Sequence, residues 1–344
     1  MSPFQSSNPQ DGITGNTELV EVRTAGSMGN GVFATQDIPR GTRIMAEVPI
    51  LSIIRESYDQ DLPAFCAAIQ RLSEAELHLL NQLYCDPSHI TTEVRQRVRQ
   101  WYKDLGIVDK RNGKILKGKR LQDVAKATVK RYGIYNTNRV QMGVEGRYGI
   151  GVFPLYSHLN HSCVPNAYNS YNPNIRRLTI HSTRDIRLGE QIFTSYINSF
   201  CRTRQQRQSM LIHWGFVCSC LACTDPSIEP LRKRMFQLDQ SLAVWNSPLM
   251  NGIARSSARS ALQDAMELVG LLNKQGLEGM ELSRTYRDCS KASLELGRMD
   301  AALDYAYKEL ENEECIMGTE TEHMRKELEG AKYWIEHLEK MCRK

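Results

Sequence analysis

Three thiols stand at Cys-x-Cys-x-x-Cys spacing, at Cys218, Cys220 and Cys223. Thiolates this close together in sequence wrap one metal ion tightly, and an all-thiolate tetrahedral set favours zinc. The triplet leaves such a site one ligand short, and we predict Cys163 as the fourth ligand, with Cys201 as the alternative. Because no position is left for water, the zinc would be structural.

Cys163 belongs to a second group of polar residues, Asn160-His161-Ser162-Cys163-Val164-Pro165-Asn166. The predicted zinc would hold this segment beside the tail that carries Trp214 and Phe216. Tyr196 follows an expected strand, and a lone Tyr at a strand end is usually a half-buried packing residue. A lone Asn is usually a turn or cap residue. Held side by side, however, these distant segments are what a composite binding site requires.

Composition indicates a folded protein. The chain has 344 residues, with 41% hydrophobic and 24% charged, which is enough for two ordinary domains with buried cores. No apolar run reaches membrane-spanning length, and the polar start lacks a secretory signal pattern, so we expect no membrane association. Ten cysteines without such a signal indicate reduced thiols in an intracellular protein of the nucleus, the cytoplasm or both.

The net charge of +5 is unevenly distributed along the chain. Between Thr91 and Arg131 there are thirteen Lys or Arg against four Asp or Glu, and the densest part is residues 109–120. This segment could meet an acidic partner or nucleic acid, or serve in nuclear import. A solvated helix and loop is the interpretation we favour. No aromatic ladder interleaves the charges, so specific nucleic-acid binding is not expected.

Periodicity divides the chain into alternating β and helical regions. Residues 17–54 and 132–197 are expected to be β, whereas about 55–131 form a helical insert that includes Ser73 as an N-cap. Strands are predicted near residues 19–22, 32–34, 44–54, 148–154, 167–171, 177–181 and 190–195. Beyond Pro226 helices are predicted at 229–246, 254–274, 280–296, 301–315 and 321–342. A turn with Asp300 as N-cap separates two of them.

These motifs, in this order, resemble the core of SET-domain methyltransferases. The opening Gly29-Asn30-Gly31-Val32-Phe33-Ala34 segment, with Ile38-x-x-Gly41, resembles the family's first strand-turn-strand. The helical insert, the post-SET cysteines and the helical end resemble the SET-and-MYND branch and its fungal relatives. The resemblance is strong over residues 17–225 and loose beyond.

The resemblance implies an α+β fold. Residues 17–225 would form a SET β-fold, with the insert at about 55–131 and a zinc-bound post-SET tail. The Asn160–Asn166 segment would thread through a loop as a pseudoknot, an exception to the usual unthreaded chain. Residues 226–344 would form an all-α, tetratricopeptide-like domain. Residues 1–16 would be a flexible N-terminus.

The resemblance also implies a site for S-adenosylmethionine and a channel for the accepting amine. Tyr196 would be the catalytic residue, orienting the methyl group and the amine with its oxygen, and Trp214 would line the substrate channel beside it. The implied cofactor-binding residues are Gly29, Asn30, Gly31, Asn138, Asn160, His161, Tyr196 and Phe216.

Two departures from the branch are visible. Trp214 stands where the branch generally has Tyr, which keeps an aromatic wall but loses the phenol oxygen. No Cys-x-x-Cys pair precedes Cys163, so the MYND finger is absent and its partner-binding role is not carried over.

The resemblance implies a protein-lysine N-methyltransferase that uses S-adenosylmethionine and structural zinc. An autonomous helical lobe favours a monomer. One alternative is methylation, or another transformation, of a small-molecule substrate, with Trp214 reshaping the channel. A second alternative is a non-catalytic interaction scaffold built from the helical region and the basic insert. The retained Asn160, His161 and Tyr196 count against the scaffold.

Overall fold

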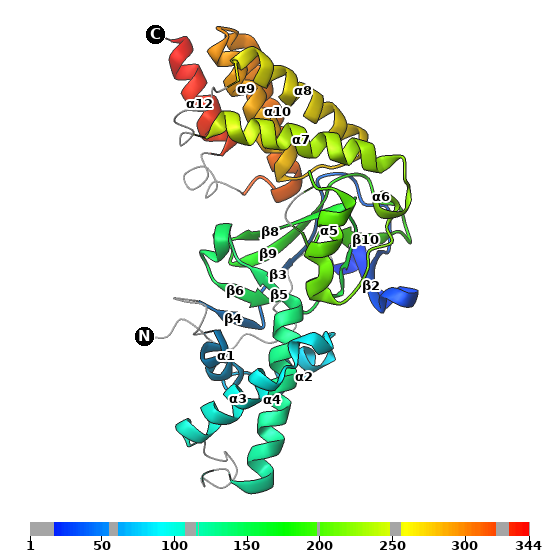
Figure 1. Ribbon diagram of the computed structural model, residues 1–344, viewed down its shortest axis with the longest axis vertical. Coiled ribbons are helices and arrows are strands. Elements are labelled where there is room, and N and C mark those ends of the chain that lie inside the picture. Colours follow the sequence, from blue (N-terminus) through cyan, green and yellow to red (C-terminus); the bar gives the residue numbers. More distant parts are fainter. Residues whose placement is uncertain are drawn as a thin grey trace.

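The computed structural model describes residues 17–54, 61–106, 115, 117–197, 200–247, 256–320 and 330–343. A bundle of short and long helices lies at one end, small sheets lie in the middle, and long helices stack at the other end (Figure 1). The N-terminus predicted to be flexible, most of the charge-dense residues 109–120, and residues 321–329 of the last predicted helix lie outside the described ranges.

The strands form three small sheets. The first has the order β1-β2-β10-β7, from Val20–Thr24, Asn30–Ala34, Gln191–Thr194 and Asn160–His161. The second has the order β3-β9-β8, from Arg43–Glu47, Arg177–Ser182 and Ala167–Asn172. The third has the order β4-β6-β5, from Leu51–Ile53, Ile150–Val152 and Arg139–Gln141. Neighbours are antiparallel, except that β7 and β10 run parallel.

The β3-β9-β8 sheet is covered on both faces. Along β9, Leu178 and Ile180 are buried in the central apolar core, and Thr179 and His181 on the other face are also buried. Helix α10 of the C-terminal region packs against β8 and β9, which explains the second buried face.

The helical insert contains α1 (Asp61–Ile69), α2 (Glu74–Gln82), α3 (Thr92–Leu105) and α4 (Gly118–Asn138). Ser73 caps α2 through a full capping box with Glu76, as the sequence predicts. The expectation that β structure returns at Tyr132 is wrong, because α4 continues to Asn138.

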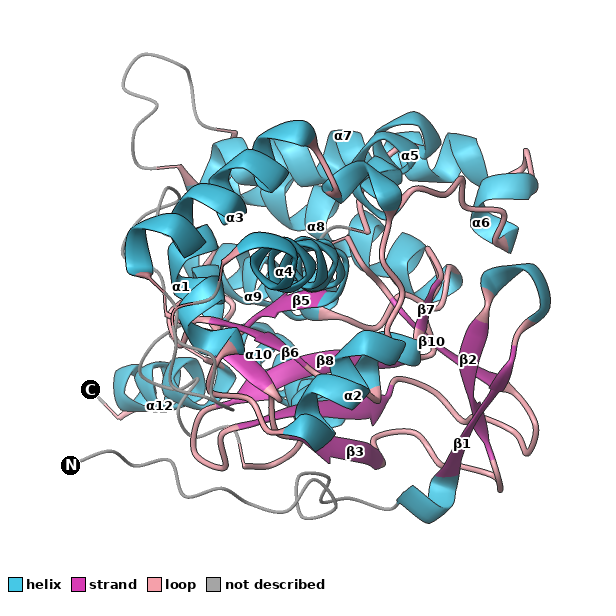
Figure 2. Cartoon of the chain, turned by 90° about the horizontal axis from the view of Figure 1, so that it is seen from below, coloured by secondary structure: helices cyan, strands magenta, loops and turns pink. Residues whose placement is uncertain are grey.

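The packing of two tyrosines explains why α4 is longer than expected. Tyr132 and Tyr135, three residues apart on one helical face, place their ring centroids 5.1 and 5.2 Å from that of Phe65 in α1. This aromatic cluster outweighs the β propensity of the local sequence. Figure 2 shows α4 nearly end-on, with β5 directly beside it.

The C-terminal region contains α7 (Ile228–Asn246), α8 (Ala258–Lys274), α9 (Met280–Glu295), α10 (Met299–Met317) and α12 (Ala331–Cys342). Fully buried Ala292, Ala302 and Ala306 allow α9 and α10 to approach closely. The prediction of Asp300 as an N-cap is wrong. The helix already begins at Met299, and Asp300 lies in its first turn, where a carboxylate favours the helix dipole. No helix in the described ranges is long and apolar enough to span a membrane.

Candidate active site and metal centre

The structure brings together the four cysteines predicted to hold zinc. The Sγ atoms of Cys163, Cys218, Cys220 and Cys223 all lie within 4.8 Å of one another. Cys163 Sγ is 4.0 Å from the sulfur of Cys218 and 3.6 Å from that of Cys223. A tetrahedral ion with metal–sulfur bonds of about 2.3 Å sets its sulfurs about 3.8 Å apart. The donor set and its spacing therefore fit zinc.

Cys201, the alternative fourth ligand, lies elsewhere. It is buried in the apolar core of the C-terminal helices with Met235 and Leu238. Cys163 reaches the triplet because β7 ends at His161, two residues before it. The triplet itself is formed around the short helix α6 (Leu221–Thr224).

Two buried guanidinium groups back the cysteine cluster. Arg207 of α5 (Arg204–Leu211) is 1% exposed, and its Nη2 donates to the Ala222 carbonyl at 2.8 Å and to Cys223 Sγ at 3.6 Å. Arg232 of α7, with no exposed surface, donates to the Cys163 carbonyl at 3.1 Å. Four thiolates around one divalent ion carry a net charge of about −2, which these two cations offset. Neither burial could be predicted from the sequence, because an arginine in a polar helix normally lies on the surface.

The parallel pairing of β7 with β10 positions the central residues of the predicted active site. Asn160 lies opposite Phe193 and His161 opposite Thr194, so Tyr196 emerges just beyond the pair. The Tyr196 backbone N–H donates to His161 Nδ1 at 3.0 Å. The neutral imidazole therefore carries its proton on Nε2, which lies 3.3 Å from Cys163 Sγ. Burial lowers the pKa of His161 to about 4, consistent with a neutral ring.

An aromatic wall surrounds Tyr196. Its ring centroid lies 5.2 Å from that of Trp214 and 6.2 Å from that of Phe216, which is perpendicular to it. The Tyr196 hydroxyl donates to the Leu159 carbonyl at 2.7 Å. Burial raises the pKa of Tyr196 well above its usual value, so the hydroxyl stays protonated at neutral pH and does not act as a strong base.

The glycine-flanked turn predicted to bind the cofactor lies against β7. Asn160 Nδ2 donates to the Asn30 carbonyl at 2.9 Å, which joins the turn to the Asn160–His161 pair. Gly29 has a φ of +76°, a conformation that favours glycine, and a side chain on Gly31 would overlap the Gln191 side chain. The structure thus assembles Gly29, Asn30 and Gly31 beside Asn160.

Asn138 lies apart from this hydrogen-bond network. It is the last residue of α4, and its Nδ2 donates to the carbonyls of Tyr84 and Ile134, each at 2.7 Å. Both partners belong to the insert. Within the described residues, no hydrogen bond links Asn138 to the other residues predicted to bind the cofactor.

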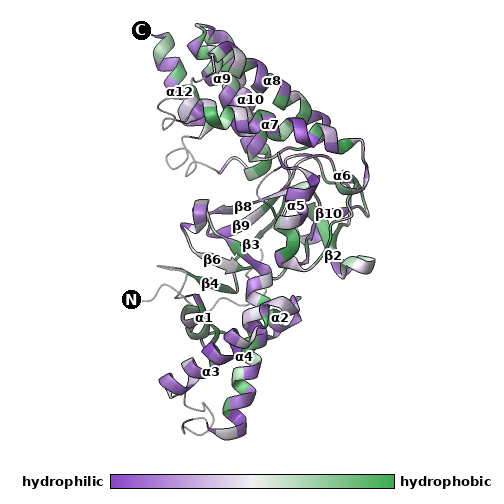
Figure 3. Ribbon diagram, viewed as in Figure 1, coloured by the Kyte–Doolittle hydropathy of each residue, from purple (hydrophilic) through white to green (hydrophobic). Residues whose placement is uncertain are grey.

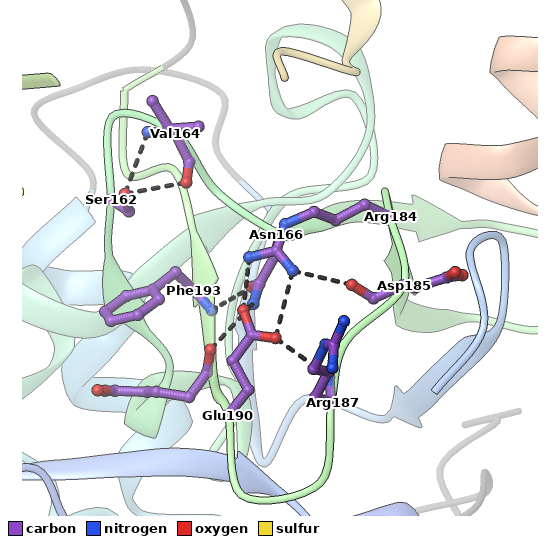
Figure 4. Close-up of polar contacts among 9 residues, drawn as sticks. Ser162, Val164, Asn166, Arg184, Asp185, Arg187, Glu190 and Phe193 are labelled. Atoms are coloured by element: carbon purple, nitrogen blue, oxygen red, sulfur yellow. Dashed lines mark hydrogen bonds and ion pairs between the residues drawn. The ribbon is translucent and has the colours of Figure 1, made fainter. Parts of the chain in front are cut away.

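Asn166, for which no separate role was predicted, locks its segment onto β10 (Figure 4). Its side chain is 1% exposed, and its Oδ1 accepts the Phe193 N–H at 2.7 Å. Its Nδ2 donates to the Gln191 carbonyl at 2.9 Å and to Glu190 Oε1 at 3.3 Å. Arg184 pairs with the same Glu190 carboxylate. Its position at the end of the Asn160–Asn166 motif was the available sequence signal.

The insert also contacts the loop that carries the aromatic wall. His89 Nε2 lies within hydrogen-bond distance of the His213 carbonyl, at 3.0 Å. The Asp86 side chain contacts Gly215, which separates Trp214 from Phe216. Neither contact was foreseen from the sequence, since Asp86 precedes Pro87 in what resembles an ordinary turn.

Comparison with known proteins identifies one domain. Residues 29–197 match the family model of the SET domain. This interval contains the glycine-flanked turn, the Asn160–Asn166 motif and Tyr196, and the cysteine triplet follows it.

The chain is similar to curated fungal proteins. It is 24% identical over 233 residues to "Histone-lysine N-methyltransferase set5" of Schizosaccharomyces pombe, covering 66% of this chain and 59% of that protein. It is 35% identical over 104 residues to "Histone-lysine N-methyltransferase SET5" of Meyerozyma guilliermondii, covering 30% of this chain and 20% of that protein. The chain therefore spans less than two thirds of the length of these relatives.

Among solved structures, the SET domain of LSMT bound to MeLysine and AdoHcy aligns with 96% of this chain and 88% of its own. The TM-score is 0.37 and the identity 16%.

Proposed function

Because residues 29–197 belong to the SET-domain family, we propose that the chain is an S-adenosylmethionine-dependent protein-lysine N-methyltransferase. One observation carries the proposal. The backbone N–H of Tyr196 donates to Nδ1 of His161 in β7 at 3.0 Å, and the Tyr196 ring packs near those of Trp214 and Phe216. The names of the fungal relatives agree with this activity.

The surface around the glycine-flanked turn fits a nucleoside cofactor. Nothing lies within 4 Å of where a Gly29 side chain would begin, so a ligand can approach this backbone closely. Phe216 is 37% exposed beside His161, which leaves an aromatic face available to a purine. We assign cofactor contacts to Gly29, Asn30, Gly31, Asn138, Asn160, His161, Tyr196 and Phe216.

The cofactor, when bound, supplies a methyl group on a positively charged sulfur. The residues of the chain must then align the accepting amine and keep it neutral. We propose that Tyr196 and Trp214, whose ring centroids lie 5.2 Å apart, line an apolar channel in which desolvation would disfavour an ammonium ion and lower the pKa of a lysine. Because its hydroxyl hydrogen is donated in a hydrogen bond to the Leu159 carbonyl, the Tyr196 oxygen offers its lone pairs to orient the amine and the methyl group.

We also propose that structural zinc locks the tail onto the β core through Cys163, Cys218, Cys220 and Cys223. The sulfur spacing and the absence of a fifth side-chain ligand in the described cluster support a closed site. Loaded with zinc, the cluster would fix the position of Phe216, two residues before Cys218.

We propose a division into a SET domain over residues 17–225 and a tetratricopeptide-like domain over 226–344, after a flexible 1–16. Helix α6 ends at Thr224 and α7 begins at Ile228, which supports the boundary. Successive pairing of α7 with α8, α8 with α9 and α9 with α10 supports the repeat-like description. The hydrogen bonds of the Asn166 side chain to β10 support a pseudoknot. The helical insert, together with the helical C-terminal region, supports the SET-and-MYND-like branch.

The substrate we propose is a lysine of a histone, which places the protein in the nucleus for at least part of its function. The names of the relatives support this choice. Trp214 favours one alternative, a small-molecule amine, because its ring stands 5.2 Å from that of Tyr196 and reshapes the channel.

The test is transfer of a labelled methyl group from S-adenosylmethionine to recombinant histones, then to protein extracts and to metabolite extracts. We expect label on protein lysines. Tyr196→Phe should lower turnover roughly 100-fold through lost alignment, whereas Tyr333→Phe, at an exposed C-terminal position, should not. Label in metabolites alone would establish the small-molecule alternative. If no histone, protein extract or metabolite extract were labelled, the non-catalytic interaction scaffold would be the remaining hypothesis.

A further inference from the structure

A pair of basic helices extends from the insert, away from the sheets and from the C-terminal helices. This basic hairpin consists of α3 (Thr92–Leu105) and the first part of α4, residues 117–131. Figure 1 shows both helices at the end of the molecule opposite to α8 and α9, and in Figure 3 most of α3 has the colour of hydrophilic residues.

The basic hairpin concentrates the positive charge of the protein. Residues 92–105 and 117–131 contain ten Lys or Arg and three Asp or Glu, an excess of seven. The whole chain has an excess of only five. The rest of the chain is therefore slightly acidic, and the positive field of the protein originates in this hairpin.

The charges on α3 form an unpaired stripe. Arg95, Arg99 and Lys103 follow one another at four-residue spacing, so they share one face of the helix. All three side chains are exposed, and none of them forms an ion pair or hydrogen bond with a described residue. The acidic residues of α3 lie off this stripe, where Glu93 is 3.8 Å from Arg97 and Asp104 accepts from Gln100.

A second stripe follows α4. Lys119, Lys126 and Lys130 are seven and four residues apart, which again places them on one helical face. Their side chains too are exposed, and none forms an ion pair or hydrogen bond with a described residue. Asp123 is the one acidic residue on that part of the helix, so the stripe keeps a positive excess.

The two stripes are held by a rigid support. Buried Val98 and Tyr102 of α3 pack against α4, and the Tyr102 hydroxyl lies 2.7 Å from Thr128 Oγ1. Trp101 packs against the same core, and its ring is perpendicular to that of Tyr102 at 5.1 Å. The aromatic rings are therefore used inside the hairpin, and are not displayed for stacking on unpaired bases.

We propose that the basic hairpin binds the phosphate backbone of duplex nucleic acid without reading its sequence. At a rise of 1.5 Å per residue the stripes run about 12 Å along α3 and about 16 Å along α4. A duplex carries one charge per about 1.7 Å of its axis, so a rigid polyanion of this kind meets both stripes at once. A short acidic peptide would neutralise only one. This surface lies outside the residues assigned to cofactor and substrate.

The test is fluorescence anisotropy of a labelled 30-base-pair DNA duplex, titrated with the full chain at several salt concentrations. The hairpin variant is Arg95→Glu/Arg99→Glu/Lys103→Glu. The matched control, Arg259→Glu/Lys274→Glu/Lys340→Glu, changes the net charge equally at exposed, unpaired positions of the C-terminal helices. We expect the hairpin variant to bind at least tenfold more weakly and the control less than threefold more weakly.

The salt dependence provides a second readout. Each lost phosphate contact lowers the slope of log affinity against log salt by about one. The slope of the hairpin variant should therefore be smaller by about three than that of the parent. If it unfolds at a lower temperature than the parent, Lys119→Gln/Lys126→Gln/Lys130→Gln replaces it, with the same direction expected. The proposal would be overturned if the parent did not bind the duplex, or if the hairpin variant and the control variant lost equal affinity. Tighter binding of an acidic polypeptide than of a duplex of matched charge would also overturn it.

Discussion

The Asp86 carboxylate lies directly against the backbone of Gly215, so that a β-carbon on Gly215 would overlap Asp86 Oδ2. Gly215 has a φ of +71° and separates the two aromatic residues that face Tyr196. Asp86 is itself fixed, since its N–H donates to Thr137 Oγ1 at 3.0 Å and its Oδ1 accepts the Ser88 N–H at 2.8 Å. The insert thereby holds the turn that forms the aromatic wall.

Gly215→Ala should disturb the active site more than the fold. The positive φ costs an alanine about 1–2 kcal/mol at this position. Gly297→Ala is the matched control, because Gly297 has the same φ of +71° with nothing within 4 Å of its missing side chain. In urea unfolding both variants should lose stability to the positive φ, and Gly215→Ala should lose more, because its β-carbon must also displace the Asp86 carboxylate. Only Gly215→Ala should lose about tenfold or more in affinity for S-adenosylmethionine, because it displaces Trp214 and Phe216.

Relief of the overlap provides a stricter check on this contact. Asp86→Ala added to Gly215→Ala removes the overlapping carboxylate and should recover most of the cofactor affinity. If the double variant binds no better than Gly215→Ala, the contact between insert and aromatic loop does not control the site.

Cys163→Ser should release zinc, and Cys201→Ser should not. Both thiols are buried, but only Cys163 lies within 4.8 Å of the triplet sulfurs. Elemental analysis of the purified variants should find about one zinc per chain in the parent and in Cys201→Ser, and little in Cys163→Ser. The melting temperature should fall together with the zinc content, since metal binding and folding are linked. A parent without metal would remove zinc from the account.

Trp214→Tyr should shift the product toward lysine carrying more methyl groups, by about twofold or more in the ratio of products. The smaller ring widens the channel beside Tyr196, 5.2 Å away. Mass spectrometry of the methylated substrate measures the ratio. Trp101→Tyr, in the insert, controls for loss of a tryptophan elsewhere. An unchanged ratio would make Trp214 a packing residue only.

Stability should depend on pH through His181. This residue of β9 is 2% exposed, its Nδ1 has no hydrogen-bond partner among the described residues, and its Nε2 faces Gly318 at the end of α10. Burial, aided by nearby Arg43, lowers its pKa to about 4, against about 6.5 in the unfolded chain. The unfolded state therefore binds more protons between pH 4 and 6.5, and stability falls as the pH falls through this window.

His181→Gln should remove that part of the pH dependence. Between pH 7 and pH 5 the parent should lose about 2 kcal/mol more free energy of unfolding than the variant does. Urea unfolding at the two pH values measures the difference, and His78→Gln, at an exposed position of α2, is the control. Equal losses in parent and variant would show that His181 does not link the sheet to α10 in this way.

Several features could be predicted because the sequence pattern states them directly. The spacing of the cysteine triplet and the Asn160–His161 pair indicated a composite site. The structure joins this site to Tyr196 through hydrogen bonds that no sequence pattern specifies, such as the one from the Tyr196 N–H to His161 at 3.0 Å. Strands β5 and β7, of three and two residues, are too short for periodicity to reveal.

Other features depend on tertiary packing, which one sequence does not contain. Arg207 and Arg232 look like surface cations in polar helices, yet both are buried behind the cysteine cluster. Asp86 looks like a turn residue, and its contact with Gly215 joins positions more than a hundred residues apart. The length of α4 followed from aromatic packing on Phe65 rather than from local propensity.

The central claim is that Asn160, His161, Tyr196 and Phe216 form a working cofactor site. Calorimetric titration of the zinc-loaded chain with S-adenosylmethionine tests it most directly, beside His161→Ala and Phe216→Ala. The account predicts micromolar affinity, worth about 8 kcal/mol, in the parent and its loss in both variants. The absence of heat from binding in the folded, zinc-loaded parent would contradict it.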